Sequence, residues 1–477
     1  MNDIGILAHG AYIPMLRLQR SAVHAANSWF APGLRGLAKG ERAMANWDED
    51  PITMAVEAAR DCLGEGPRPS LASILFASTS APFADRQNAG VIKEALNLPD
   101  AIGALDAGGS LKAGTSALLL ALESADAGNR LVIAAEMRKT LPASEGEMLQ
   151  GDAAASLLVG RGDLAARYRG HHSVTADFID HFRQSGEAMD YGWEARWVRE
   201  EGHGKLALEA LKTGLARLGV RPESIAHFIG PPARGIPEML AKKSGIRAEA
   251  VRDTLAASVG DSGAAHPLLL LSACLETAKA GETIAVLSFG QGVDLLVFEA
   301  TGKGARPRLG VSGHLARRRA EPNYLKFLSF NGNLALDRGM RAEADMKQPL
   351  TALWRNRRTV LGLVGGRCSK TGTVQFPRSD IGVNPNDHTI GTQEDYPLAD
   401  IPARIVSFTA DSLTYSPDPP QHYGMIDFEG GGRMMAEFTD VAPGELAVGQ
   451  NMRMMFRIKN SDERRGFTRY FWKAVPA

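Results

Sequence analysis

An acid and a histidine stand close together in the segment GDSGAAHPLLLL, residues 260–271. Asp261 would act as a general base if a dry surrounding raised the pKa of its carboxyl. His266 begins a segment of helical character, and the partial positive charge at a helix N-terminus disfavours the imidazolium. We therefore expect His266 to stay neutral and able to accept a proton. A structural role, in which His266 caps its helix or packs at an interface between two halves of the fold, explains the residue equally well.

A second loop, GGSLKAGTSALLL at residues 108–120, also leads into a segment of helical character. A nucleophilic thiol is favoured at the start of a helix, because the partial positive charge there lowers its pKa. This loop presents Leu111 between Ser110 and Lys112, and a leucine forms no bond to an acyl group. We expect Ser110 to be an unactivated serine that caps the helix; a displaced nucleophile is the lesser alternative.

Short apolar runs that end in small residues must position these loops. Examples are SILFASTS (73–80), RLVIAAEM (130–137) and TIAVLSFGQG (283–292). They alternate with longer Ala- and Leu-rich segments, which is typical of an α/β fold with buried strands.

One part of this pattern repeats. Residues 121–133, ALESADAGNRLVI, align with residues 274–286, CLETAKAGETIAV, at a constant offset of 153. Each copy reads as a helix, a glycine stop and a strand. The repeat predicts a duplicated fold. In the second copy, His266 takes the position that Ala113 has in the first. His266 should therefore lie near the loop that is equivalent by pseudo-twofold symmetry to the Leu111 loop.

The composition and the hydrophobic pattern of the sequence change beyond residue 302. Residues 303–349 are basic and contain Gly and Pro without a sustained apolar period, so we interpret them as a connector. From residue 350 onward, short alternating segments are separated by Pro, Gly and Asp. This spacing predicts an all-β barrel or sandwich.

The amino-acid composition limits which classes of binding partner and which cellular compartment we expect. The 477 residues include 54 Lys and Arg and 54 Asp and Glu, so no general positive field favours nucleic acid or an anionic membrane. Three widely spaced cysteines suit a reducing compartment. The N-terminus lacks the features of a secretory signal, and no run reaches the roughly 18 apolar residues that span a bilayer. We expect a cytoplasmic protein with no nucleic-acid or membrane partner.

Four motifs occur in order in the first part of the chain: GILAHGAYIPMLRL (5–18), WDEDPITMAVEAARDCL (47–63), SVTADFIDHFR (173–183) and SFGQG (288–292). They resemble hydroxymethylglutaryl-CoA synthase and its relatives in the thiolase superfamily. The resemblance implies an α/β fold of the duplicated thiolase type, with five layers in the order αβαβα. Its halves would be residues 1–165 and 166–302.

The last part of the chain contains GGRCSKTGTVQFP (365–377) and SPDPPQHYGMIDFEGGGRM (416–434). These motifs resemble an acyl-CoA-associated OB-fold family whose members usually carry an N-terminal zinc ribbon. The resemblance implies that residues 350–477 form a degenerate zinc ribbon and an all-β OB-fold barrel. The expected ligand positions hold only one thiolate, so zinc is unlikely; they are Cys368, Thr371, Gly382 and Asp387.

Against the synthase motifs, this chain departs at four positions that the resemblance marks as functional. Leu111 stands in the place of the catalytic cysteine, Thr79 in that of the glutamate and Gly230 in that of the histidine. Asp261 replaces an asparagine. The resemblance therefore implies a retained substrate pocket, lined by Thr79, Ser110, Leu111 and Gly230, without the covalent chemistry of the family.

Loss of the cysteine favours, as our first interpretation, an aldolase or retro-aldolase that acts on a 3-hydroxyacyl-CoA without an acyl-enzyme. An oxyanion site and a base suffice for that step. Asp261, His266 or Tyr191 would be the acid or base, with Tyr191 suggested by thiolase-like steroid side-chain aldolases. Two alternatives remain open: an acyltransferase or condensing enzyme of the synthase type, and a non-catalytic acyl-CoA-binding partner of another thiolase.

The resemblance also implies the ligand and the assembly state. Coenzyme A would enter as part of the substrate, with no tightly bound cofactor, and its phosphates would meet basic side chains. The candidates are Lys112, Arg234, Lys242 and Lys243. Because thiolase-type domains commonly pair, we expect a homodimer.

Overall fold

The structure is a computed structural model that describes residues 3–65, 68–442 and 444–477. Its contacts divide the chain into two compact units. The first comprises Met1–Ala45, Asp50–Ala89 and Asp100–Leu334, and the second comprises Asn46–Glu49, Gly90–Pro99 and Ala335–Ala477. Among the described residues, no helix is long and apolar enough to cross a membrane.

A nine-stranded sheet, counted over the described residues, forms the frame of the first unit in the order β11-β12-β13-β8-β1-β7-β6-β4-β5. The strands are β1 (Ile4–Tyr12), β4 (Ser73–Ala77), β5 (Gly103–Ala107), β6 (Arg130–Glu136), β7 (Ala153–Arg161), β8 (Ala166–Thr175), β11 (Ile225–Ile229), β12 (Thr283–Phe289) and β13 (Gly292–Ala300). Within the described residues, strands β1 and β8 pair only at Gly5 with Arg167 and at Ile6 with Ala166. This short joint lets the two parts of the sheet face one another.

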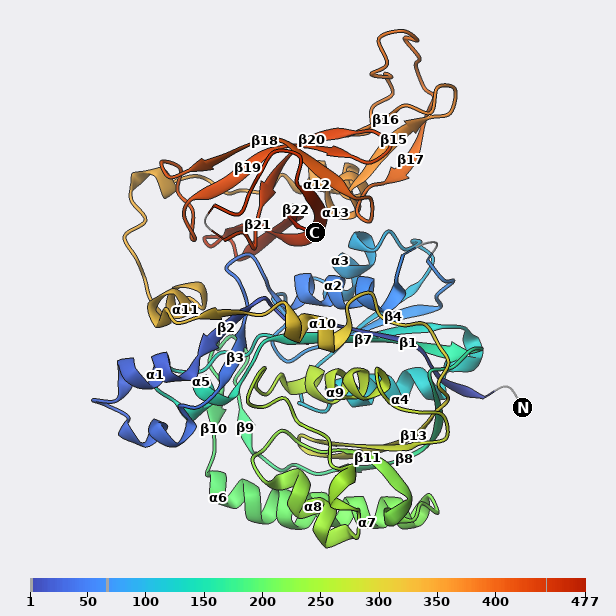
Figure 1. Ribbon diagram of the computed structural model, residues 1–477, viewed down its shortest axis with the longest axis vertical. Helices are drawn as coiled ribbons and strands as arrows, with labels where there is room; N and C mark the ends of the chain where they lie inside the picture. Colours follow the sequence, from blue (N-terminus) through green and yellow to red (C-terminus); the bar gives the residue numbers. More distant parts are fainter. Residues whose placement is uncertain (1–2, 66–67, 443) are drawn as a thin grey trace. The chain divides into compact units, whose positions relative to one another are not determined.

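Two helices lie side by side between the two parts of the sheet (Figure 1). They are α4 (Ala113–Glu123) and α9 (His266–Leu275). Both are apolar around most of their circumference, as expected for helices covered on both faces.

Further helices cover the outer faces of the sheet (Figure 1). Helices α2 (Pro51–Leu63) and α10 (Gly310–Ala316) pack on the β1–β7 side, while α7 (Leu208–Arg217) and α8 (Ile236–Ser244) pack on the β8–β11 side. The order of layers is therefore αβαβα, which confirms the predicted fold class.

The structure also confirms the duplication. Helices α4 and α9 begin at Ala113 and His266, and strands β6 and β12 begin at Arg130 and Thr283, so both pairs keep the offset of 153. The two helix starts lie close together, since a Cβ built on Gly114 would stand 2.1 Å from the carbonyl oxygen of Ala264.

One buried histidine joins the sheet to the central helices. His9 lies in β1 and is 3 % exposed, and its Nδ1 lies 2.9 Å from the hydroxyl of Ser272 in α9. Burial lowers the pKa of His9 from 6.5 to about 4.

This histidine makes the fold sensitive to acid. Between pH 6.5 and pH 4 the unfolded chain binds a proton at His9 that the folded chain excludes, so stability falls as the pH falls through this range. The expected loss is about 3 kcal/mol. Urea unfolding at pH 7, 6 and 5 should give a shallower pH slope for His9→Gln. His388→Gln, at an exposed position, is the control; equal slopes for the two variants would contradict the assignment.

The predicted connector contains more regular structure than its composition suggested. Besides α10, residues 303–349 contain β14 (Arg319–Glu321) and α11 (Tyr324–Phe330). Strand β14 pairs with β2 (Leu16–Gln19), which also pairs with β3 (Glu41–Met44). Tyr324 and Phe327 are buried. These elements are too short to leave a periodic signal, and they belong to the first unit as far as Leu334.

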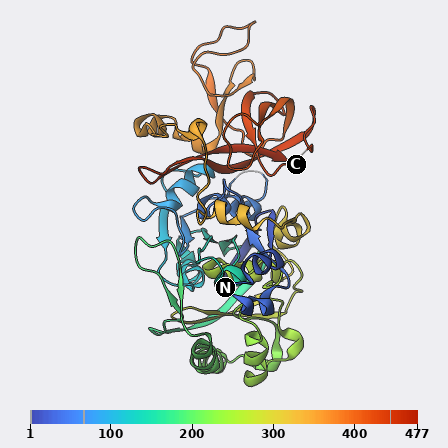
Figure 2. The same ribbon diagram turned by 90° about the vertical axis from the view of Figure 1, so that its left-hand side faces the viewer.

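A closed barrel forms the main part of the second unit, in the order β18-β19-β20-β22-β21 (red in Figures 1 and 2). Its strands are β18 (Ala403–Asp411), β19 (Gln421–Phe428), β20 (Arg433–Phe438), β21 (Asn451–Asp462) and β22 (Phe467–Pro476). The barrel confirms the predicted all-β C-terminal fold. A small sheet of β15 (Val364–Cys368), β16 (Val374–Gln375) and β17 (Gln393–Pro397) precedes it.

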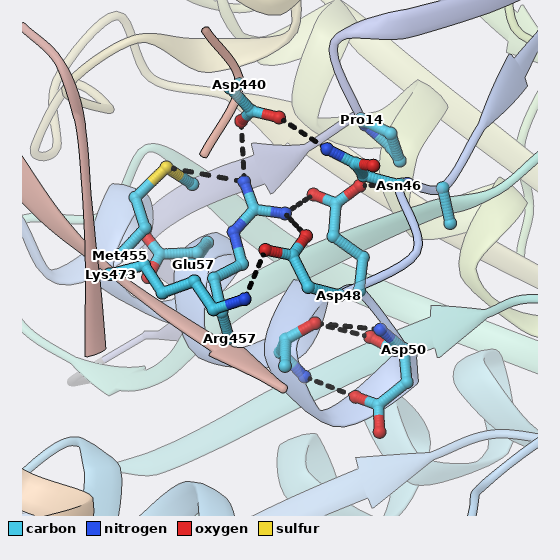
Figure 3. Close-up of polar contacts among 12 residues, drawn as sticks. Pro14, Asn46, Asp48, Asp50, Glu57, Asp440, Met455, Arg457 and Lys473 are labelled. Carbon is cyan, nitrogen blue, oxygen red and sulfur yellow. Dashed lines mark hydrogen bonds and ion pairs between the residues drawn. The ribbon is translucent and has the colours of Figure 1, made fainter. Parts of the chain in front are cut away.

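Four residues from early in the chain, Asn46–Glu49, belong to this second unit. Two of them, Asp48 and Glu49, meet the guanidinium of Arg457, a fully buried side chain of β21 (Figure 3). Arg457 pairs with Glu49, with Asp440 at 2.7 Å and with Asp48 at 3.6 Å. One buried cation is thus surrounded by three carboxylates.

A second buried cation supports the same segment. Lys473 of β22 lies 3.0 Å from Asp48 and 3.4 Å from Glu437. Its ammonium also stands 4.0 Å from the centre of the Trp47 ring, which is a cation–π contact. The segment Asn46–Glu49 is therefore an integral part of the interior of the second unit.

Candidate active site

The loop with Leu111 is held in place by the hydroxyl of Ser110. Ser110 donates to the carbonyl oxygen of Gly290 at 2.6 Å and accepts from the backbone N–H of Lys112 at 3.2 Å. The residue before α4 is Lys112, and no side chain caps the helix. Ser110 therefore does not cap the helix as we predicted. Its hydroxyl instead forms a hydrogen bond that connects the Leu111 loop with the loop that contains Gly290.

Two glycines make room for Leu111. A Cβ added at Gly290 would stand 3.0 Å from the Cβ of Leu111. A Cβ added at Gly263 would stand 3.2 Å from the Cδ2 of Leu111. Gly263 also has φ +52°, which side chains rarely adopt. Leu111 therefore packs tightly between the loop after β12 and the loop before α9.

A buried carboxyl, Glu136, ends strand β6 beside this leucine. Its Cγ lies 3.2 Å from the same Cβ position at Gly263. One carboxylate oxygen, Oε1, accepts from the N–H of Thr79 at 2.7 Å and from its hydroxyl at 3.0 Å. The other, Oε2, accepts from the hydroxyl of Ser80 at 2.5 Å.

The surroundings of Glu136 suit a proton acceptor. Burial raises the pKa of Glu136, and this effect exceeds the opposing effects of Arg138 and of the Ser80 and Thr79 hydrogen bonds. A carboxyl with a raised pKa accepts protons more readily near neutral pH. Thr79, which stands in the place of the family's glutamate, thus orients an acid from the neighbouring strand.

Asp261 forms an ion pair with Arg138, which follows Glu136 by two residues. Arg138 donates to Oδ2 of Asp261 at 2.7 Å, and the backbone N–H of Gly263 donates to Oδ1 at 2.9 Å. Burial pushes the pKa of Asp261 upward, but Arg138, His266 and the Gly263 bond outweigh it, so the pKa lies below its ordinary value. The condition that we set for Asp261 as a base, a raised pKa, is therefore not met.

His266 lies in the interior, 1 % exposed, with both ring nitrogens occupied. Nδ1 lies 3.2 Å from both the N–H and the hydroxyl of Ser262, and Nε2 lies 3.0 Å from the carbonyl oxygen of Thr254. Burial lowers the pKa of His266, so the imidazole is neutral. No described side chain caps the start of α9, so these bonds fit a structural packing role better than a cap, while the role of His266 as a proton acceptor stays a prediction.

Tyr191 lies in a short hairpin of β9 (His181–Phe182) and β10 (Tyr191–Gly192). The side chain is 56 % exposed and its ring lies 5.3 Å from that of Phe182. Among the described residues, no hydrogen bond or ring contact joins Tyr191 to Asp261 or His266. Asp190, the residue before Tyr191, forms an ion pair with Arg138 of the site at 3.8 Å.

The remaining predicted pocket residue, Gly230, directly follows β11. A Cβ at Gly230 would stand 3.0 Å from the Cβ of Pro237 in the first turn of α8. The glycine therefore allows the strand and the helix to approach closely. A histidine at this position would have to displace that contact.

The four predicted coenzyme A ligands fall into two groups. The ammonium of Lys112 lies 3.3 Å from the buried carboxylate of Asp294, which also accepts from Thr115 at 2.8 Å. This ion pair gives Lys112 an internal partner. The others have exposed side chains on and just before α8, and their role stays a prediction; they are Arg234, Lys242 and Lys243.

The predicted zinc-ribbon region holds its single cysteine among threonines. The sulfur of Cys368 lies 3.2 Å from the hydroxyl of Thr392 and 3.5 Å from that of Thr389. In the part of the chain that the structure describes, no group of three His, Cys, Asp or Glu side chains is placed to hold a metal ion. Two further cysteines, Cys62 and Cys274, are buried and free.

The loop geometry gives a direct test at position 111. We expect Leu111→Cys to form an acyl thioester when the protein meets an acyl-CoA, because the start of α4 lowers the pKa of a thiol there. Native Cys62 and Cys274 should stay unlabelled, since burial raises the pKa of each to about 12. Peptide mapping by mass spectrometry locates the acyl group and separates position 111 from Cys368. An unlabelled cysteine at position 111 would contradict this geometry.

Sequence reasoning missed two charged residues at the centre of this site, Glu136 and Arg138. Both directly follow the apolar residues of the run RLVIAAEM, which we interpreted only as a buried strand. The available signal was the pair of opposite charges at the C-terminal end of that strand. In α/β sheets this end of a strand is where functional side chains gather.

Comparison with curated proteins gives relatives over 61% of the chain. The chain is 30% identical over 303 residues to hydroxymethylglutaryl-CoA synthase of Thermococcus sibiricus, covering 61% of this chain and 84% of that protein. It is 29% identical over 302 residues to the synthase of Pyrococcus horikoshii, with the same coverage.

Solved structures share the fold. MvaS in complex with 3-hydroxy-3-methylglutaryl coenzyme A has a TM-score of 0.58 at 18% identity, covering 70% of this chain and 93% of that one. FabH (3-oxoacyl-(acyl carrier protein) synthase III) of Pseudomonas aeruginosa PAO1 has a TM-score of 0.56 at 17% identity, covering 64% and 100%. Xanthomonas campestris OleA with bound lauric acid and lauroyl-CoA has a TM-score of 0.56 at 18% identity, covering 63% of this chain and 99% of that one.

The C-terminal part matches the family described as ChsH2, C-terminal OB-fold domain, over residues 396–457. Together these comparisons overturn our first interpretation of the chemistry. The sequence relatives are named synthases, which join carbon skeletons, so the aldolase or lyase interpretation is wrong and the condensing, acyl-transferring alternative is favoured. The replaced cysteine, glutamate and histidine led us to discard the reaction type, although replacement of these groups does not by itself define the reaction.

Proposed function

Because the chain belongs to the hydroxymethylglutaryl-CoA synthase family, we propose that it is a condensing enzyme of the acyltransferase type. It would transfer the acyl group of one acyl-CoA to a carbon atom of a second acyl thioester. The observation that carries the proposal is the buried carboxyl of Glu136 beside Leu111, with its raised pKa and two hydroxyl donors.

The condensation needs a base that removes a proton from the carbon next to a thioester carbonyl. Glu136 takes this proton, and the resulting enolate attacks the carbonyl carbon of the acyl donor to form the new C–C bond. The positive charge of Arg138 acts on Glu136 and lowers the energy of negative charge that develops nearby. Leu111 excludes water from this side, which protects the enolate from protonation.

Coenzyme A enters the proposal as part of the substrate, without a tightly bound cofactor. Relatives in the solved structures contain hydroxymethylglutaryl-CoA or lauroyl-CoA. In this chain the exposed cations on and before α8, Arg234, Lys242 and Lys243, are suited to the phosphates of the carrier. A homodimer remains our expectation for the assembly.

A second candidate is an acyl-CoA-binding partner of another thiolase, without turnover of its own. One observation favours it: Leu111 and the ion pair between Arg138 and Asp261 occupy positions where the family's chemistry takes place. Such a subunit would keep the substrate pocket while a cysteine-bearing partner performed the reaction.

The two candidates differ in what the pure protein does. The full chain is incubated with pairs of acyl-CoA thioesters of different length, and mass spectrometry follows the condensed product while a thiol reagent measures released CoA. We expect a product that carries both acyl groups and one equivalent of free CoA. Saturable acyl-CoA binding without any product over the whole panel would contradict the condensing enzyme and support the binding subunit.

A further inference from the structure

The hydroxyl of Ser80 has the surroundings of an activated nucleophile. It donates to Oε2 of Glu136 at 2.5 Å and accepts from the backbone N–H of Met137 at 2.9 Å. Glu136 is fully buried and its pKa is raised, whereas Ser80 is partly exposed. A nucleophile within hydrogen-bond reach of a base, with the base held by a third group, is the arrangement used in covalent catalysis.

Thr79 is the third group in this arrangement. Its N–H and its hydroxyl both bind Oε1 of Glu136, which leaves Oε2 for Ser80. Arg183 in turn binds the carbonyl oxygen of Thr79 and pairs with Asp190 at 2.6 Å. The turn that presents Ser80 is thus fixed from both sides.

We infer that Ser80 carries the acyl group in this chain, in place of the thiol that position 111 lacks, with Glu136 as its base. The inference rests on the proposed condensing function and deepens it by naming the acyl carrier. The required substrate class is an acyl-CoA thioester that reaches the partly exposed face of Ser80.

The steps balance without a further reactant. Glu136 takes the hydroxyl proton of Ser80 as Oγ attacks the thioester carbonyl; the C–S bond breaks, and the CoA thiolate leaves with the proton from Glu136. An acyl ester on Ser80 remains. Glu136 then removes the α-proton of the second thioester, the enolate carbon attacks the ester carbonyl, and the C–O bond to Ser80 breaks. Ser80 Oγ recovers its proton from Glu136.

Two other hydroxyls near the start of α4, those of Ser110 and Thr115, fit this role less well. The hydroxyl of Ser110 donates to a carbonyl oxygen, which accepts no proton at neutral pH. Thr115 faces a buried carboxylate, Asp294, but Thr115 is 1 % exposed and Asp294 is paired with Lys112.

Acyl labelling tests the inference on the full-length protein. The protein is incubated with radiolabelled acetyl-CoA, quenched in acid and mapped by mass spectrometry. We expect one acyl ester on the peptide that contains Ser80, and none in Ser80→Ala, which should also lose at least about a thousandfold of the condensation rate. Ser124→Ala is the matched control, because Ser124 is also partly exposed but its hydroxyl donates to a backbone carbonyl oxygen, that of Leu120; it keeps the label. Ser80→Cys should regain acylation as a thioester that neutral hydroxylamine cleaves, which separates a chemical role from a folding defect.

Label and product are measured separately, so the two proposals fail separately. Condensation at the wild-type rate in Ser80→Ala, or condensation by the wild type with the label elsewhere or nowhere, overturns the role of Ser80 and leaves the condensing function standing. Label on Ser80 without a condensed product supports the acyl carrier and overturns the condensing function. Neither label nor product overturns both.

Discussion

Replacing Glu136 with glutamine lowers the condensation rate by about a hundredfold to ten-thousandfold, which is the usual contribution of a general base. Glutamine preserves the size and can still accept from Thr79, but it cannot take up a proton. The wild-type rate should rise with pH as Glu136 ionises, because burial raises the pKa of this carboxyl and keeps it protonated at pH values where other glutamates are charged. The variant should lose this rise, and measurement of the rate against pH checks both points.

The same variant should not be less stable. A carboxyl whose pKa is higher in the folded than in the unfolded chain favours folding at low pH, and this contribution is lost as the pH rises through the folded pKa. A neutral side chain at position 136 therefore keeps or increases stability at pH 8. Glu147→Gln is the matched control, since burial also raises the pKa of Glu147, which bonds to Tyr324. Equal losses of activity in the two variants would contradict the role of Glu136.

Replacing Arg457 with methionine lowers the free energy of unfolding by about 3–5 kcal/mol, because it leaves buried carboxylates without their cation. Methionine fills much of the space, so the loss reports on charge more than on packing. Asp48, Glu49 and Asp440 lose this partner together. Urea unfolding followed by circular dichroism and by tryptophan fluorescence measures the change.

An exposed ion pair in the same barrel provides the control. Arg433 of β20 pairs with Asp427 of β19, and the two side chains are 58 % and 43 % exposed. Arg433→Met should cost less than about 1 kcal/mol, since exposed pairs gain little in water. A similar loss in both variants would show that the buried cluster is no more important than a surface pair.

Much of the fold was predictable because the sequence repeats and alternates on the scale of whole elements. The offset of 153 came from aligning residues 121–133 with residues 274–286 of the same chain, and the starts of α4 and α9 and of β6 and β12 keep this offset in the structure. The barrel was predictable from short alternating segments. Elements such as β14 and α11 were not, since a strand of three residues and a helix of seven leave no periodic signal.

The candidate site was harder to predict because its groups come from separate strands. Leu111 and Asp261 were visible in short motifs, whereas the contact of Thr79 and Ser80 with Glu136 spans more than 50 positions. Asp261 was predicted as a general base if its pKa was raised, and no sequence pattern indicated that Arg138 would be its partner. Tyr191 was selected by analogy, but the residue before it, Asp190, makes the ionic contact with the site.

The segment Asn46–Glu49 has a consequence for how the chain can be divided. The carboxylates of Asp48 and Glu49 neutralise Arg457 and Lys473 inside the barrel unit, although about 290 positions separate that segment from the start of the main C-terminal part. A gene fragment that begins at Ala335 would encode the barrel strands without these two acids. The C-terminal part is therefore not a detachable module, because two acids that neutralise its buried cations are encoded far upstream of the barrel strands.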